Sequence, residues 1–176
     1  INITEPISMP NLILLGPSGA GKSSCAKILA EQTKLSLVDS DKLIAEGTGM
    51  SPQQIFATMG EATFRELENQ LLDSLFEEIA PFVLACGGGL PIFPGNIEKL
   101  NRLGLTVYLK AGPQALAKRV LASEARPMLD GEGDLVNRVS QLLAKRAPVY
   151  EKAQFTVDTT GMTVEETVQT ILNYLK

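Results

Sequence analysis

Short apolar runs alternate along the chain with longer segments in which apolar residues recur at helical spacing. The runs predict strands near residues 12–15, 35–38, 82–86, 106–109 and 155–157. The amphipathic segments predict helices at 22–32, 41–47, 52–59, 61–79, 94–103, 113–121, 134–147 and 164–175. Alternation of strands with helices is typical of right-handed crossovers, so we expect an α/β fold with a parallel sheet covered on both faces.

The longest predicted helix, 61–79, carries a charged group at the edge of its apolar stripe. The stripe runs from Phe64 to Ile79, and Arg65 lies next to its first residue. Glu61, one turn earlier, and Glu68, three residues later, have the spacing that holds a guanidinium in place. A held arginine suits bidentate recognition of a carboxylate or phosphate. The alternative is an ordinary solvated helix charge.

The composition predicts one soluble globular domain, because 44% of the 176 residues are hydrophobic and 20% are charged. We assign residues 9–176 to this domain and interpret 1–8 as a leader, a loose tail or a cloning remnant. Sixteen basic and twenty acidic residues give a net charge of −4, which argues against nucleic acid or an anionic membrane as a partner. Because no signal or membrane-spanning pattern is present, we expect a cytoplasmic protein.

The chain contains no histidine, which excludes Ser-His-Asp and Cys-His catalysis and all histidine-ligated metal sites. Proton transfer must therefore use carboxylates, lysine, tyrosine or water. Cys25 and Cys86 lie in apolar stretches without metal-ligand spacing, so we expect both to be small buried side chains.

The strongest chemical signal is Gly16–Ser23, which reads Gly-Pro-Ser-Gly-Ala-Gly-Lys-Ser and matches the phosphate-binding pattern G-x-x-x-x-G-K-S. It lies between a predicted strand and a predicted helix, so backbone N–H groups and the helix N-terminus can face one anion. Lys22 can then reach the terminal phosphates of a nucleoside triphosphate, and the Ser23 hydroxyl can bind its metal ion. The alternative, a tight turn, would need only one or two of these glycines.

Two carboxylates follow the second predicted strand, in the segment Asp39-Ser40-Asp41. Because ligands gather at the carboxyl ends of parallel strands, both should face the phosphate loop. Asp39 can hold a metal ion as an outer ligand beside Ser23. Asp41 can orient a hydroxyl acceptor and take its proton. The alternative is a helix N-cap with a neighbouring surface acid.

Three further segments have both a functional and a structural interpretation. Gly87–Gly89 follow the third predicted strand, where close approach of a ligand to bare backbone explains all three glycines better than a turn does. Arg146 lies near the end of the helix 134–147, either as a charge that complements the helix dipole or as one arm of a carboxylate clamp. Residues 122–134 lack a clean period and form either a surface loop or a lid over bound nucleotide.

Together these motifs resemble the shikimate kinase family, because they occur in the family's order between about residues 12 and 158. The segments that carry the resemblance are Gly-Pro-Ser-Gly-Ala-Gly-Lys-Ser (16–23), Asp-Ser-Asp (39–41), Gly-Glu-Ala-Thr-Phe-Arg (60–65), Gly-Gly-Gly (87–89), Arg-Pro-Met-Leu (126–129) and Lys-Arg-Ala-Pro-Val-Tyr (145–150). The resemblance implies a single-domain P-loop kinase fold, with parallel strands in the order 2-3-1-4-5 flanked by helices and a mobile lid at about 122–134. It implies ATP-dependent phosphorylation of the 3-hydroxyl of shikimate, giving shikimate 3-phosphate and ADP for aromatic amino-acid biosynthesis, by a cytoplasmic monomer that uses Mg²⁺.

The resemblance also assigns residues to sites by position. It implies an ATP site formed by Gly19, Ala20, Gly21, Lys22, Ser23, Ser24, Arg119 and Arg126, with Arg126 on the lid and Arg119 over the adenine. It implies a shikimate site formed by Asp41, Arg65, Gly87, Gly88, Gly89 and Arg146, in which the two arginines clamp the carboxylate. Lys22, Asp41 and Arg126 would be catalytic, and Ser23 and Asp39 would bind the metal ion.

The chain departs from the family pattern at two places. The lid reads Arg-Pro-Met-Leu where a second leucine is usual, a change that conserves volume. Residues 159–162, which should face adenine, match nothing distinctive. Two other functions stay open: a small-metabolite kinase of the gluconate kinase type, which the paired arginines and the absence of histidine disfavour, and a non-catalytic nucleotide-binding regulator, which the presence of Lys22, Asp41 and Arg126 disfavours.

Overall fold

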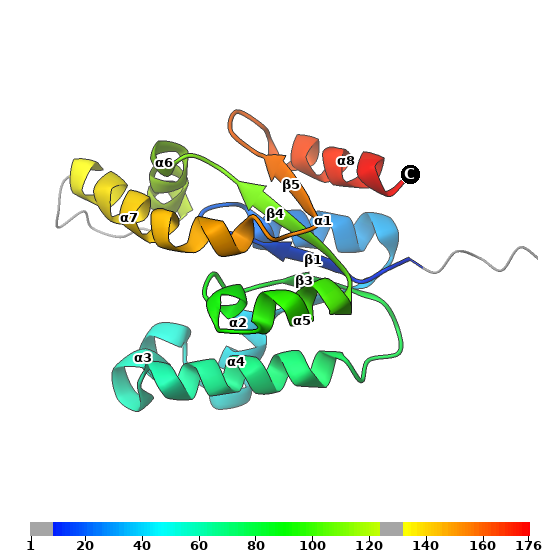
Figure 1. Cartoon of the computed structure of the whole chain (residues 1–176), viewed down its shortest axis with the longest axis horizontal. Helices are drawn as coiled ribbons and strands as arrows, with labels where there is room; N and C mark the ends of the chain where they lie inside the picture. The colour runs from blue at the N-terminus through cyan, green and yellow to red at the C-terminus, as the bar shows by residue number, and fades with distance from the viewer. Residues whose placement is uncertain (1–8, 124–131) are drawn as a thin grey trace, which may run out of the picture.

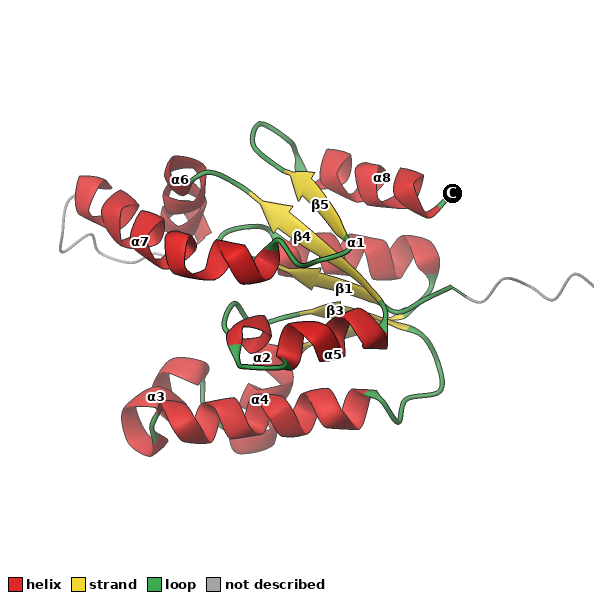
Figure 2. Ribbon diagram, in the orientation of Figure 1, coloured by secondary structure: helices red, strands yellow, loops and turns green. Residues whose placement is uncertain are grey.

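The structure, a computed structural model, describes residues 9–123 and 132–176. In this part of the chain, parallel strands form a sheet in the order β2-β3-β1-β4-β5 (Figures 1 and 2). The strands are β1 (Leu12–Leu15), β2 (Ser36–Asp39), β3 (Phe82–Ala85), β4 (Leu105–Lys110) and β5 (Phe155–Asp158). This confirms the α/β class and the strand order that the family resemblance implied.

Helices cover both faces of the sheet (Figure 2). One face packs against α1 (Lys22–Thr33) and α8 (Val164–Leu175), and the other against α4 (Glu61–Leu75), α5 (Asn96–Leu103) and the end of α7 (Glu132–Tyr150). The remaining helical elements are α2 (Ser40–Thr48), α3 (Pro52–Met59), η1 (Leu90–Ile92) and α6 (Pro113–Ser123).

The central strand β1 shows why its sequence is an uninterrupted apolar run. Leu12 and Leu14 pack into the core under α1 and α8, whereas Ile13 and Leu15 pack into the core on the opposite face. All four side chains are completely buried. A strand covered on both faces has no polar side, so the alternation typical of half-exposed strands is absent.

A smaller apolar cluster joins α2, α3 and α4 through Ile44, Ile55 and Phe64. It holds α2 and α4, the helices that carry Asp41 and Arg65, against each other beside the sheet (Figure 1). The predicted burial of both cysteines, Cys25 and Cys86, is confirmed.

Two predicted helix ends are wrong by three residues or more. Helix α4 ends at Leu75 rather than at residue 79, and Ile79 is 99% exposed instead of lying on the apolar stripe. The N–H groups of residues 76–78 donate to carbonyl oxygens three residues earlier, which tightens the chain into a turn before β3 starts. Helix α7 continues through Pro148 to Tyr150, beyond the predicted end at 147. The proline removes one N–H donor, while the extra turn buries Tyr150 completely in the core.

Among the described residues, we find no helix that combines the length and the apolar character needed to cross a bilayer.

Candidate active site

The phosphate loop has the predicted context, because it leaves the carboxyl end of β1 and enters α1 at Lys22. Gly19 and Gly21 adopt φ angles of 84° and 90°, a left-handed conformation that side chains with a Cβ rarely adopt. A Cβ atom at Gly19 would also lie 2.9 Å from the carbonyl oxygen of Leu116. The backbone conformation therefore favours glycine at both positions, and the lack of space beside Leu116 favours it at Gly19 as well.

Lys22 folds back over this loop. Its Nζ atom donates hydrogen bonds to the carbonyl oxygens of Gly16 and Pro17, the latter at 2.9 Å. Loss of water around the ammonium lowers the pKa of Lys22 to about 8, although Cys86, Asp41 and Asp39 nearby act in the opposite direction. A polyanion that enters the loop would favour the protonated form, so nucleotide binding and protonation of Lys22 should support each other.

Ser23 and Asp39 form the candidate metal site. The Ser23 hydroxyl donates to Asp39 Oδ2 at 2.8 Å, while Asp39 Oδ1 accepts from the N–H of Lys42 as the N-cap of α2. Among the described residues, no group of three or more Asp, Glu, Cys or His side chains is placed so that it could hold a metal ion. A single carboxylate with a hydroxyl fits Mg²⁺, which keeps most of its ligands as water and phosphate oxygens.

Asp41 lies in the first turn of α2 and faces the glycine segment after β3. A Cβ atom at Gly87 would be only 2.5 Å from Asp41 Oδ1, so only glycine leaves room for this carboxylate. Burial raises the pKa of Asp41, and the charge of Asp39 raises it further, while Lys22 and Arg65 oppose the shift. The carboxylate is therefore a better proton acceptor than an aspartate in water.

Arg65 is fixed on several sides. Its Nη1 donates to Glu68 Oε1 at 2.5 Å, and its Nη2 donates to Glu61 Oε1 at 3.4 Å. The guanidinium also lies over the rings of Phe56 and Phe64, with its Cζ atom 5.6 and 5.5 Å from the two centroids. These contacts confirm the predicted pairing with both glutamates and restrict the rotamers open to Arg65.

Glu68 combines deep burial with an unused acceptor. Its side chain is 1% exposed, and its Oε2 atom finds no hydrogen-bond partner among the described residues. Burial raises the pKa of Glu68, whereas the bond from Arg65 lowers it. The Oε2 atom would be 3.2 Å from a Cβ at Gly87, so this free acceptor borders the same space as Asp41.

The three consecutive glycines each face a different functional side chain. Added Cβ atoms would meet Asp41 at Gly87 and Arg146 Nη1, 3.3 Å away, at Gly88, and at Gly89 would overlap the guanidinium of Arg65. Side chains from α2, α4 and α7 thus converge on one short loop. Close approach of the protein's own side chains therefore requires these glycines, and the predicted approach of a ligand stays a prediction.

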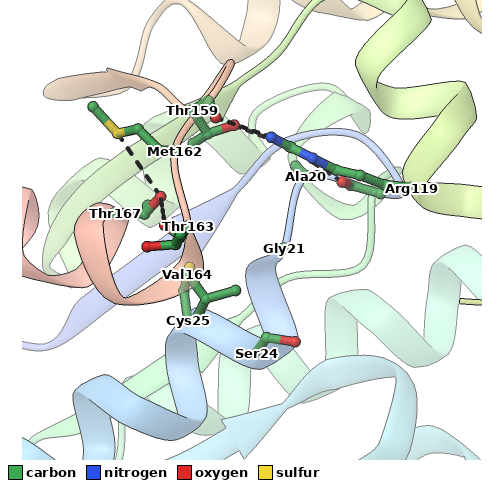
Figure 3. A pocket seen from close by; sticks show the side chains of 11 residues that line it. Ala20, Gly21, Ser24, Cys25, Arg119, Thr159, Met162, Thr163, Val164 and Thr167 are labelled. Atoms are coloured by element: carbon green, nitrogen blue, oxygen red, sulfur yellow. Dashed lines mark hydrogen bonds between the residues drawn. The ribbon is translucent and has the colours of Figure 1, made fainter. Parts of the chain in front are cut away.

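Two hollows meet at the phosphate loop. One, about 330 Å³, is lined by residues 18–24, Asp39, Asp41, Cys86, Gly87 and Gly88, among others. The other, about 370 Å³, shares Gly19, Ala20, Gly21 and Ser24 with the first and continues between Arg119 and the start of α8 (Figure 3). The arrangement can hold an elongated ligand with its anionic middle at the loop.

Arg119 borders the second hollow and is held by the segment after β5. Its Nη1 donates to Thr159 Oγ1 at 3.0 Å, and its Nη2 donates to the carbonyl oxygen of Thr159 at 2.9 Å (Figure 3). Thr159, Met162 and Thr163 line this hollow. Thr159 and Met162, from the segment that showed no distinctive pattern, therefore line the same hollow as Arg119, and their contact with adenine stays a prediction.

The described candidate site residues line the two hollows or, like Arg65, Gly89 and Arg146, meet at the glycine loop that borders one of them. Arg126 and the rest of 124–131 lie outside the described residues. Sequence reasoning missed several contacts: Phe56 under Arg65, Thr159 beside Arg119, and Ser40 and Tyr150 on the glycine loop. Ser40 had a signal in its place between two candidate aspartates, Tyr150 in the motif 145–150, and Thr159 in the segment 159–162, but none of these signals indicated a bond.

Comparisons with known proteins agree with this geometry. A family model described as shikimate kinase matches residues 18–176. The shikimate kinase of Geobacter metallireducens is 38% identical over 99% of this chain and 96% of its own length, and that of Parabacteroides distasonis is 39% identical over 95% and 98%.

Solved structures show the same likeness. The shikimate kinase of Acinetobacter baumannii in complex with shikimate superposes with a TM-score of 0.85 at 34% identity, covering 95% of this chain and 93% of that one. The enzyme of Bacteroides thetaiotaomicron gives a TM-score of 0.85 at 32% identity over 96% and 99%. Because the family model and these relatives span nearly the whole chain, the chain belongs to the shikimate kinase family.

Proposed function

We propose that this chain transfers the γ-phosphoryl group of ATP to the 3-hydroxyl of shikimate, giving shikimate 3-phosphate and ADP. The observation that carries the proposal is the convergence of Asp41, Arg65 and Arg146 on Gly87–Gly89. Asp41, Gly87 and Gly88 also line the hollow at the phosphate loop. Family membership and the shikimate complex of the Acinetobacter baumannii relative support the same substrate.

The two arginines would recognise the carboxylate of shikimate. Arg65 comes from α4 and Arg146 from α7, and both approach the glycine loop. A guanidinium presents parallel N–H donors to a carboxylate, which fixes orientation as well as charge. Since Glu68 and the rings of Phe56 and Phe64 already hold Arg65, little side-chain entropy remains to be lost on binding.

The nucleotide would occupy the two adjoining hollows. Its phosphates would lie on the loop from Gly19 to Ser24 under Lys22, and its base would lie beside Arg119. We assign Ser23 and Asp39 to Mg²⁺, which when bound neutralises charge on the β- and γ-phosphates. The hydroxyl and carboxylate of this pair are the atoms that would hold the ion or its water shell.

Asp41 would act on the acceptor hydroxyl. Its carboxylate orients the 3-hydroxyl toward the γ-phosphorus, and the proton moves to Asp41 as the new O–P bond forms and the bond to ADP breaks. The raised pKa favours this transfer at neutral pH. All these groups lie in one chain, so we propose that the monomer is active. We also propose that the protein works in the cytoplasm, because its substrate is ATP.

The test is an ADP-release assay with shikimate, quinate, gluconate and shikimate methyl ester as acceptors. We expect turnover with shikimate, and a large rise in KM when esterification removes the carboxylate charge. Lys22→Ala serves as the inactive control. Turnover with gluconate but not shikimate would indicate the other kinase type, and nucleotide binding without turnover would indicate a regulator.

A further inference from the structure

The glycine loop that collects the substrate-facing side chains is itself held by two buried hydroxyl groups. The Oγ atom of Ser40 accepts a hydrogen bond from the N–H of Gly87 at 2.7 Å. The hydroxyl of Tyr150 donates to the carbonyl oxygen of Gly88 at 2.6 Å. The two-residue segment Gly87–Gly88 is thus bonded at its first N–H and at its last carbonyl.

Both hydroxyl-bearing residues are completely buried, with 0% exposure. A buried amide or carbonyl that loses its partner cannot recover the bond from water, so these bonds restrain the loop more strongly than exposed ones would. The hydroxyls come from elements far apart in the chain: Ser40 begins α2, and Tyr150 ends α7. The loop is therefore bonded to the elements on either side of it.

Each hydroxyl is next to a substrate-facing group. Ser40 immediately precedes Asp41, whose Oδ1 atom packs against Gly87. Tyr150 follows Arg146 by one helical turn, and a point above Gly88 lies 3.3 Å from Arg146 Nη1 and 3.7 Å from the Tyr150 hydroxyl. Displacing the loop at either bond therefore changes the space available to one substrate-facing side chain.

We propose that Ser40 and Tyr150 are positioning residues of the acceptor site: Ser40 sets Gly87 against Asp41, and Tyr150 sets Gly88 against Arg146. In this proposal neither residue touches ATP or the transferred group. Ser40 acts through the glycine loop, and Tyr150 acts through the loop and through its side-chain hydrogen bond with Arg146. The inference rests on the proposed shikimate kinase activity. It predicts effects on the acceptor side of the reaction that leave the nucleotide side unchanged.

The structure offers a matched control for each residue. Tyr108 is the buried ring that packs on Tyr150, at 5.3 Å between centroids, and the structure shows no bond from it to the glycine loop. Thr106 is completely buried, and its hydroxyl accepts from the N–H of Gln154 at 2.9 Å, away from the site. Tyr108→Phe and Thr106→Val therefore remove a buried hydroxyl without touching the loop.

The experiment compares steady-state kinetics of Tyr150→Phe, Ser40→Ala and Ser40→Thr with these controls, each corrected for the folded fraction from thermal unfolding. We expect Tyr150→Phe to raise the KM for shikimate about tenfold, because small misplacements of binding groups have effects of this size. We expect Ser40→Ala to lower kcat about tenfold, and Ser40→Thr, which keeps the hydroxyl, to restore most of it. The KM for ATP should change by less than about twofold in all of them.

Wild-type shikimate KM in Tyr150→Phe, equal losses in Tyr108→Phe or Thr106→Val, or parallel changes for ATP would overturn the proposal. If Tyr150→Phe does not fold, the Ser40 pair decides: wild-type kcat in Ser40→Ala, or failure of Ser40→Thr to recover, overturns it. Failure of the proposed activity is seen separately, as absence of shikimate-dependent ADP release by the unmodified protein.

Discussion

Gly89 offers a substitution that displaces Arg65 without straining the backbone. Gly89 has φ −92° and ψ −12°, a right-handed conformation that alanine adopts readily. The new Cβ atom would lie 2.6 Å from Cζ of Arg65 and closer still to both terminal nitrogens. Because carbon atoms pack at about 3.5–4.0 Å, the guanidinium must retreat by about 1 Å.

The retreat should weaken carboxylate binding strongly. Arg65 cannot move toward α4 freely, because Phe56, Phe64 and Glu68 already occupy its other sides. A misplacement of about 1 Å in a binding group can change rates by about a hundredfold, so we expect the shikimate KM of Gly89→Ala to rise about 10- to 100-fold. The KM for ATP should stay near its wild-type value, since the phosphate loop is untouched.

The assay measures ADP release at varied shikimate and at varied ATP, together with the thermal unfolding midpoint. Gly112→Ala is the control, because an added Cβ there meets nothing within 4 Å. The shikimate KM of Gly88→Ala should fall between those of Gly89→Ala and Gly112→Ala, since its Cβ would lie 3.3 Å from Arg146 Nη1. A folded Gly89→Ala protein with an unchanged shikimate KM would refute the placement of Arg65 in the acceptor site.

The other predictions concern charge at the same site. Asp41→Asn should lower kcat by about a hundredfold or more while sparing ATP binding; near-normal kcat would contradict its role. Glu68→Gln should raise the shikimate KM severalfold, because Arg65 loses a charge-assisted bond; an unchanged KM would count against that contact. Since the pKa of Lys22 is lowered to about 8, kcat/KM for ATP should fall as pH rises through 8. A flat profile of kcat/KM for ATP above pH 8 would oppose the assignment. Between about pH 8 and 10.5 the Lys22 side chain is protonated in the unfolded chain but not in the folded one, so its contribution to the free energy of unfolding should rise with pH there.

Several features of the fold were predictable because they depend on neighbouring residues alone. The left-handed φ angles of Gly19 and Gly21 follow from the loop pattern, since only glycine adopts them without strain. The spacing of Glu61 and Glu68 around Arg65 likewise predicts their pairing, because helical geometry fixes which side chains meet.

Helix ends were less predictable, because tertiary packing sets them. The apolar pattern continues to Ile79, yet the chain turns earlier and leaves that side chain in solvent. Pro148 suggests a helix end, yet burial of Tyr150 holds one more turn of α7. At the end of α7, packing of Tyr150 against Tyr108 of β4 outweighed the local preference.

By itself, the sequence determined the phosphate loop, the alternating α/β order and the residue types of the site. Only the tertiary structure decided that Asp41, Arg65 and Arg146 face one three-glycine loop and that Ser40 and Tyr150 bond to it. It also decided that Glu68 Oε2 finds no partner within residues 9–123 and 132–176. The physical reason is that burial, pKa shifts and hydrogen bonds at this site depend on groups that are distant in the chain. Such groups become neighbours only when parallel strands bring their carboxyl ends to one edge of the sheet.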